Sequence, residues 1–92
     1  MSIELQETFD KAVKFASSPE CGKLGLSTNQ KGHLYAYFKQ ANLGDCNGSR
    51  PGMFNLVARE KYDAWKTCEG MEKEEAMKKY IAIIEGVAPE FK

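Results

Sequence analysis

The chain has 92 residues, of which 42% are hydrophobic and 28% are charged. This length and balance predict a single globular domain over residues 1–92 and exclude a wholly disordered chain. Thirteen basic side chains balance thirteen acidic ones, so no sequence-wide positive field favours nucleic-acid binding, and any anion site has to be local.

The cysteines indicate a reducing compartment. Cys21, Cys46 and Cys68 are odd in number, widely spaced and form no CxxC motif. Together with His33, the single histidine, they provide no plausible zinc set, so no metal site is expected. No apolar run approaches the roughly 18 residues of a membrane span, and the polar N-terminus is unlike a signal peptide. We therefore expect a cytoplasmic protein without an integral membrane segment.

The N-terminal segment 2–18 predicts a first helix. Ser2 is expected to cap it, and Pro19 to end it, because the residue before a proline avoids the α region. The following stretch "PECGKLGL" is expected to be a loop. One stripe of a 3.6-residue period is formed by Leu5, Phe9, Ala12, Val13 and Ala16.

A capping-box pattern, Ser27-x-x-Gln30, predicts a second helix over residues 28–42 that stops near Gly44. Its expected core stripe is Leu34, Phe38 and Ala41. The next stretch, "LGDCNGSRPGMFN", contains the turn-forming pairs Gly-Asp, Asn-Gly and Pro-Gly, and so predicts a long loop. The residues expected to anchor that loop to the core are Met53, Phe54 and Leu56.

Two further helices complete the predicted fold. The third is expected over 57–69, and the fourth from the acidic turn 72–75 to Val87, before Pro89. The third carries an apolar arc of Val57, Ala58, Tyr62, Ala64, Trp65 and Cys68. Because helical spacing dominates and no strand-like alternation is visible, the sequence predicts an all-α bundle.

No common enzyme motif is present. The sequence has no G-x-S-x-G, HExxH, Walker or Rossmann glycine pattern. Cys46 lies in the predicted loop near Asp45 and Arg50, but no histidine is placed to activate it. His33 is expected on the surface, so the sequence does not predict an enzyme.

Two lysines lie beside a tyrosine on the second predicted helix. At about 100° per residue, Lys31 and Lys39 fall roughly 40° either side of Tyr35, at the edge of the buried face. Tyr37 points to nearly the opposite side. Because an edge lysine can reach water with its ammonium, this stripe is also compatible with an ordinary amphipathic helix.

The third and fourth predicted helices repeat the pattern. Lys61 falls in the middle of an apolar arc, where its ammonium needs water or an anion. Tyr80 falls on the last apolar arc, where its hydroxyl needs a partner if it is buried. Each residue alone is most often an edge lysine or a core tyrosine. Taken together, these side chains from three helices predict a pocket for an anion beside an aromatic ring.

The motif pattern between Leu34 and Ile81 closely resembles the acyl-CoA-binding protein family, also known as diazepam-binding inhibitor. The matching blocks are "LYAYFKQANLGDCNGSRPGM", "KYDAWKTCEG" and "KEEAMKKYI", with "FDKA" near the N-terminus as a weaker match. The resemblance implies a four-helix up-down-down-up bundle. It also implies a protein that binds medium- to long-chain fatty acyl-CoA esters as ligands, without a cofactor and without transforming them.

The resemblance also implies site residues. In that family the ribose 3′-phosphate and adenine are held at positions matching Tyr35, Lys39 and Lys61, and the positions of Phe38 and Tyr80 contribute to the same site. Further candidates are Lys31 and Lys14 toward the phosphates, and Leu5, Phe9 and Ala12 toward the acyl chain. Phe38 occupies a position that is commonly tyrosine, which removes one hydroxyl contact.

The sequence thus predicts a monomeric carrier and buffer of acyl-CoA esters that serves acyl-CoA-using enzymes. The competing hypothesis is a helical protein–protein adaptor, which predicts an exposed apolar patch and no converging lysine pair. An acyl carrier protein is rejected, because such proteins are strongly acidic and need an Asp-Ser-Leu attachment site that this sequence lacks.

Overall fold

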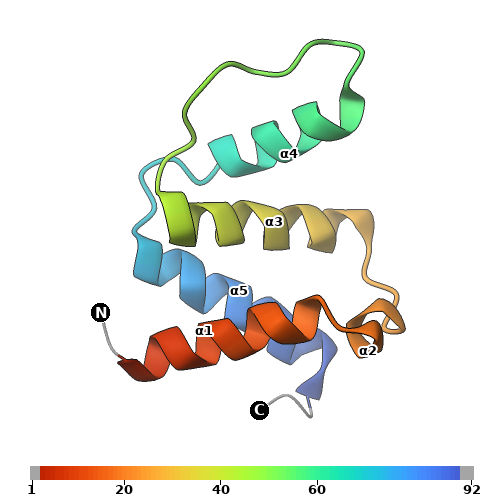
Figure 1. Cartoon of the computed structure of the whole chain (residues 1–92), viewed down its shortest axis with the longest axis vertical. Helices are drawn as coiled ribbons and strands as arrows, with labels where there is room; N and C mark the ends of the chain where they lie inside the picture. Colours follow the sequence, from red (N-terminus) through yellow and green to blue (C-terminus); the bar gives the residue numbers. More distant parts are fainter. Residues whose placement is uncertain (1–2, 90–92) are drawn as a thin grey trace.

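The computed structural model describes residues 3–89, which form five helices and no strand. The helices are α1 (Ile3–Ala16), α2 (Pro19–Gly22), α3 (Thr28–Leu43), α4 (Leu56–Lys66) and α5 (Lys73–Val87). Among the four long helices, α1 and α5 run one way and α3 and α4 run the other way (Figure 1). The predicted all-α bundle with up-down-down-up order is confirmed.

The four long helices form a thin slab. Helix α5 packs against both α1 and α3, and α4 packs against the other side of α3 (Figure 1). The principal extents of 39 × 32 × 16 Å agree with this arrangement, since the shortest extent is little more than one helix diameter. Helix α4 is therefore the outermost helix on its side and leaves much of its surface uncovered.

The hydrophobic core lies between α1, α3 and α5. Its buried members are Phe9, Ala12, Leu34, Ala41, Ala76, Met77, Tyr80, Ile81 and Ile84. The predicted stripe of α3 is confirmed in Leu34 and Ala41, while Phe38 is partly buried and packs against the core. Tyr37, expected to face away, also packs against this core and stacks on the exposed ring of His33.

The capping box at the start of α3 is confirmed. The Ser27 hydroxyl accepts from the Gln30 N–H at 3.0 Å, and the Gln30 side-chain oxygen accepts from the Ser27 N–H at 2.9 Å. Gly44 ends α3 at φ +81°, a conformation that glycine adopts without strain. The predicted cap of α1 at Ser2 lies outside the described residues.

The connection from α1 to α3 differs from the expected loop, because residues 19–22 form α2. Ser18 caps this helix by accepting from the Cys21 N–H at 3.4 Å, and Pro19 occupies its first turn. Serine followed by proline is a helix-start signal, since proline lacks the N–H that the first turn leaves unpaired. The sequence therefore contained this signal, and the loop prediction was wrong for these four residues.

The long segment between α3 and α4 is anchored by polar contacts. Arg50 donates two hydrogen bonds to the Asp63 carboxylate, at 2.9 and 2.7 Å, and the Tyr62 hydroxyl donates to the Gly48 carbonyl at 3.3 Å. The predicted apolar anchors are instead exposed: Met53 and Leu56 by 67% and Phe54 by 97%. That prediction was wrong because α4 has no helix on its outer side that could bury them.

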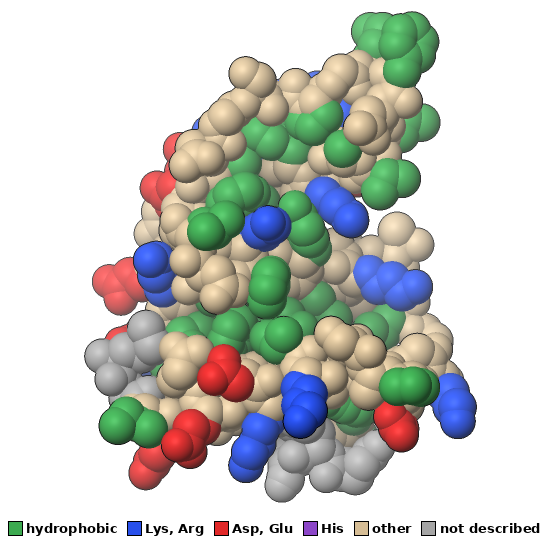
Figure 2. Space-filling view, in the orientation of Figure 1, with side chains coloured by type: hydrophobic (Ala, Val, Ile, Leu, Met, Phe, Trp, Pro, Cys, Tyr) green, Lys and Arg blue, Asp and Glu red, His purple; other side chains and the backbone are tan. Residues whose placement is uncertain are grey.

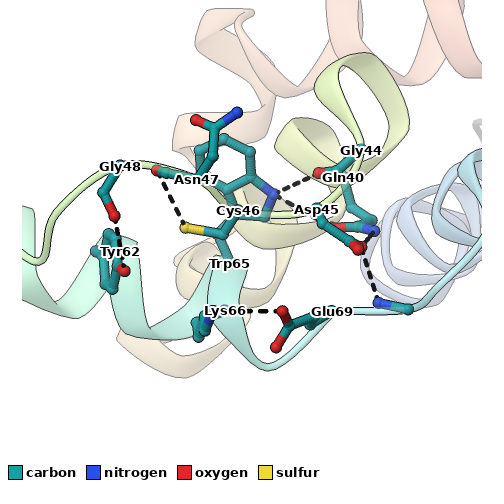
Figure 3. Close-up of polar contacts among 11 residues, drawn as sticks. Gln40, Gly44, Asp45, Cys46, Asn47, Gly48, Tyr62, Trp65, Lys66 and Glu69 are labelled. Atoms are coloured by element: carbon teal, nitrogen blue, oxygen red, sulfur yellow. Dashed lines mark hydrogen bonds and ion pairs between the residues drawn. The ribbon is translucent and has the colours of Figure 1, made fainter.

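A buried polar network joins the C-terminal ends of α3 and α4 (Figure 3). The indole N–H of Trp65 lies 2.9 Å from the Gly44 carbonyl and 3.2 Å from the side-chain oxygen of Gln40. The Gln40 amide donates to the Asp45 carboxylate at 2.9 Å and to the Met71 carbonyl at 2.8 Å. Because Gln40 is fully buried, these bonds fix the relative position of the two helices.

Candidate functional site

Two lysines from different helices approach one tyrosine ring. The Lys39 ammonium lies 5.7 Å from the centroid of the Tyr35 ring, and the Lys61 ammonium lies 5.3 Å from the same centroid. Both distances are within the range of a cation–π contact. The structure therefore brings together the three residues that the sequence placed at the centre of the predicted site.

The convergence follows from the arrangement of α3 and α4. Tyr35 and Lys39 are four residues apart and so share one face of α3. Helix α4 runs parallel to α3, and the Trp65 hydrogen bonds fix its position along that helix. Trp65 also contacts the site directly, since the Lys39 ammonium lies 5.8 Å from its ring. The buried network thus positions Lys61 beside Tyr35.

Lys61 is exposed rather than buried in an apolar arc. Its predicted neighbour Val57 is 64% exposed, and only the C-terminal part of the arc, at Trp65 and Cys68, is buried. The lysine therefore reaches solvent without a desolvation cost. Its ammonium is available to an anion that binds beside Tyr35.

Two hollows flank Tyr35, and both include Lys31. The first, here called the α2 hollow, has a volume of about 370 Å³ and lies between α2, α3 and α5. The second, here called the α3–α4 groove, has a volume of about 180 Å³. The α2 hollow is lined by Ala16, Cys21, Leu26, Lys31, Leu34, Tyr35 and Tyr80, among others. The α3–α4 groove is lined by Thr28, Lys31, Gly32, Tyr35, Val57, Glu60 and Lys61.

Tyr80 provides the floor of the α2 hollow. Its side chain is buried, and its ring meets the Phe9 ring edge-on at 5.2 Å between centroids. Burial raises the pKa of the Tyr80 hydroxyl to about 12. The hydroxyl therefore stays protonated at neutral pH and can donate a hydrogen bond to an anionic ligand.

Lys39 and the remaining residues named from the sequence line neither hollow. Phe38 stacks on Phe9 at 6.5 Å between centroids, and Phe9 and Ala12 are buried in the core behind the site. Leu5 is half-buried on α1, and Lys14 is exposed near the end of that helix. Their contacts with a ligand stay predictions.

Gly32 and Val57 line the α3–α4 groove, but the sequence did not mark Gly32 at all and placed Val57 only on an apolar arc, not in the site. Gly32 lies inside α3, where glycine is less favourable than alanine by about 1 kcal/mol. A Cβ added at Gly32 would meet no atom within 4 Å. An unfavourable glycine in a helix interior was thus an available signal that this position leaves space open on the helix surface.

The groups around Tyr35 are suited to binding an anion. Among residues 3–89, no three His, Cys, Asp or Glu side chains gather as a metal site. Cys21, Cys46 and Cys68 are free and buried, and burial raises the pKa of the Cys68 thiol, which disfavours a reactive thiolate. No helix within that described range is both long and apolar enough to span a bilayer. Cations, an aromatic ring and a partly apolar groove suit an amphiphilic anion.

Comparison with known proteins identifies the family. The family model described as acyl CoA binding protein matches residues 6–84. Acyl-CoA-binding protein homolog 3 of Caenorhabditis elegans is 44% identical over 83 residues, which cover 89% of this chain and 72% of that protein.

Solved structures agree in fold. Acyl-CoA-binding protein 2 of Oryza sativa matches with a TM-score of 0.84 and 40% identity, over 96% of this chain and 92% of that one. ACBP from Moniliophthora perniciosa matches with a TM-score of 0.86 and 38% identity, over 100% of this chain and 85% of that one. The sequence resemblance is confirmed, and this chain belongs to the acyl-CoA-binding protein family.

Proposed function

We propose that this protein binds medium- to long-chain fatty acyl-CoA esters and carries and buffers them without chemical transformation. The observation that carries the proposal is the convergence of Lys39 and Lys61 on Tyr35, between two hollows. A ligand with a phosphorylated nucleotide at one end and an alkyl chain at the other matches this arrangement. Membership of a family of binding proteins supports the same conclusion.

The cationic cluster is proposed to bind the ribose 3′-phosphate. Two ammonium groups near the Tyr35 ring can form charge-assisted hydrogen bonds with phosphate oxygens, and an aromatic ring can stack on the adenine. Lys31 is proposed to neutralise the diphosphate of CoA, which its position in the lining of both hollows supports. The protonated Tyr80 hydroxyl adds a donor in the α2 hollow.

The acyl chain is proposed to lie in the α3–α4 groove. Gly32 and Val57 give that groove a wall without polar side chains between Lys31 and the start of α4. Each methylene removed from water there contributes about 0.8 kcal/mol. Affinity is therefore expected to rise with chain length until the groove is full.

Calorimetric titration with free CoA and palmitoyl-CoA tests the proposal. We expect palmitoyl-CoA to bind far more tightly, because the acyl chain adds burial that free CoA lacks. Equal affinities would contradict the proposed role of the groove, and no heat from either ligand would contradict acyl-CoA binding itself.

The cellular setting is part of the proposal. A cytoplasmic setting is supported by the three free and buried thiols, which suit a reducing compartment. We further propose that the protein is a monomer and supplies acyl-CoA-using enzymes. The adaptor hypothesis predicts an exposed apolar patch without a converging lysine pair, and the structure has exposed apolar side chains at Met53, Phe54 and Leu56. Because Lys39 and Lys61 converge beside the groove, acyl-CoA binding is the better supported function.

A further inference from the structure

The segment leading into α4 exposes four large apolar side chains, here called the α4 tip: Met53, Phe54, Leu56 and Val57. Each is at least 64% exposed, and Phe54 is 97% exposed. In Figure 2 a hydrophobic group projects from the top right of the molecule, where Figure 1 shows this segment entering α4. Five consecutive positions with four such side chains form an apolar patch, unlike single apolar residues scattered on a surface.

The α4 tip is held in its projecting shape by the backbone around it. The Asn55 N–H donates to the Gly52 carbonyl at 3.0 Å, which closes a tight turn around Met53 and Phe54. The Asn55 side chain then accepts from the Ala58 N–H at 3.3 Å and caps α4. These bonds position the Phe54 ring outside the fold.

The unpaired charges next to the α4 tip are mostly basic. From Cys46 to Ala58 the sequence contains no aspartate or glutamate and one arginine, Arg50, which pairs with Asp63. Arg59 and Lys61 then follow on α4, with the acidic Glu60 between them. On the face shown in Figure 2, Lys and Arg side chains lie among hydrophobic ones over α3 and α4, whereas over α1 and α2 both basic and acidic side chains occur. Apolar side chains with basic neighbours complement a surface that has anionic groups outside and an apolar interior beneath them.

We propose that the α4 tip docks on anionic phospholipid membranes. The tip projects outward, so a protein partner would need a matching socket, whereas a fluid lipid surface accommodates a projecting side chain without one. Aromatic and aliphatic side chains enter the boundary between headgroups and acyl chains, and neighbouring basic side chains approach anionic headgroups. Phe54 supplies the aromatic group, and Arg59 supplies a nearby basic group.

Docking at the α4 tip would also direct the α3–α4 groove toward the lipid. Val57 belongs to the tip and lines the groove, so the two features are continuous. Acyl-CoA esters are amphiphiles that partition into bilayers, so a docked protein would meet its ligand there. This use of docking rests on the proposed function, whereas docking itself does not.

Vesicle flotation of the ligand-free protein tests the inference. The lipids are phosphatidylcholine alone and phosphatidylcholine mixed with phosphatidylglycerol, and the variants are Phe54→Ser and Ile3→Ser. Ile3 is a matched control, because it is 77% exposed and lies on α1 at the opposite edge of the molecule. We expect the wild type and Ile3→Ser to bind the mixed vesicles, and Phe54→Ser to bind roughly tenfold more weakly or worse.

A Phe54→Trp variant gives a second readout. Its added tryptophan should shift its emission to shorter wavelength with mixed vesicles, while Trp65, already buried, contributes a constant background. Equal flotation of Phe54→Ser and wild type, or equal loss in Ile3→Ser, would overturn the inference. Absence of wild-type flotation would overturn it too. The inference would also be overturned if the wild type bound no vesicles but formed a dimer that the Phe54→Ser substitution dissociates. The α4 tip would then be a contact between two copies of the chain.

Calorimetry with palmitoyl-CoA on the same variants separates the two proposals. We expect Phe54→Ser to retain wild-type affinity, because Phe54 lines neither hollow. If the wild type floats with vesicles but binds no acyl-CoA, the proposed function fails and membrane docking stands. If it binds acyl-CoA but ignores vesicles, only membrane docking fails.

Discussion

The two ends of the α3–α4 pair differ sharply in packing. At the C-terminal end, the indole of Trp65 is buried and bonded to Gly44 and Gln40. At the N-terminal end, Gly32 faces Val57 across an open groove, and the aromatic ring of Phe54 is almost wholly exposed. The same pair of parallel helices is thus fixed at one end and open at the other.

The two ends therefore suit different parts of a ligand, because one end fixes the positions of its side chains and the other leaves space. The closed end fixes the spacing between Lys39 and Lys61, which a phosphate needs because charge-assisted hydrogen bonds depend on geometry. The open end leaves space, which suits alkyl chains because burial in a groove is non-directional and depends on area. Tyr35, Lys39 and Lys61 lie between the two ends, so one ligand can place its phosphate beside them and its alkyl chain in the groove.

The largest expected effect is on stability at the closed end. Trp65→Ala removes a buried indole together with its two hydrogen bonds, so we expect a loss of about 3–5 kcal/mol in the free energy of unfolding. Phe54→Ala is the matched control at the open end, and we expect a change within about 0.5 kcal/mol. Urea unfolding of both variants measures this difference. Similar losses in the two variants would show that the ends are not as different as their packing indicates.

A smaller effect is expected from closing the open end. Gly32→Leu places a side chain in the α3–α4 groove, where an added Cβ meets no atom within 4 Å. If it displaces two methylenes of the ligand, palmitoyl-CoA should bind about 1–2 kcal/mol more weakly while short-chain esters bind as before. Thermal-shift measurements over a series of chain lengths, followed by calorimetry, would detect the shift.

Gly86→Leu is the control for the helix itself. Gly86 lies in α5, is exposed, and also has no neighbouring atom within 4 Å of an added Cβ. Both substitutions gain helix propensity, so neither is expected to lower the melting temperature. An unchanged chain-length profile in Gly32→Leu, or the same change in Gly86→Leu, would contradict the assignment of the groove.

The smallest expected effect depends on pH and concerns Asp45 at the closed end. The Gly70 N–H, which donates at 2.8 Å, and the Gln40 amide lower the pKa of the Asp45 carboxyl. Because the folded-state pKa is depressed, the stabilisation is present above the unfolded pKa, about 4, and is lost as pH falls through the folded value. We therefore expect the difference in melting temperature between wild type and Asp45→Asn to shrink below about pH 4. A difference that is independent of pH would argue against a role for the ionised carboxylate.

Local sequence signals predicted most of the helices correctly. The capping box at Ser27 and Gln30 and the glycine at position 44 located both ends of α3. The edge stripe of Tyr35 and Lys39 was also visible, because neighbours on one helix follow from its period alone. These features involve residues close together in the chain.

The errors came from packing between distant segments. Met53, Phe54 and Leu56 were expected in the core because they are apolar, but burial requires an opposing surface, and α4 has one only on the side of α3. Gln40 was not singled out, because its partners Trp65 and Met71 are 25 and 31 residues away. Periodicity reports the shape of one helix and not the position of its neighbours.

The most direct test of the proposed cationic site compares palmitoyl-CoA with an analogue that lacks the ribose 3′-phosphate. Calorimetry on the wild type should show that the analogue binds about 1–3 kcal/mol more weakly, the range for losing charge-assisted hydrogen bonds. In Lys39→Ala and Lys61→Ala, palmitoyl-CoA should itself bind more weakly, and the difference between the two ligands should become smaller. Lys78→Ala, on α5 and outside both hollows, should keep the wild-type difference. If the wild type binds the two ligands equally, or if the lysine variants keep the full difference, the cluster around Tyr35 does not bind the 3′-phosphate.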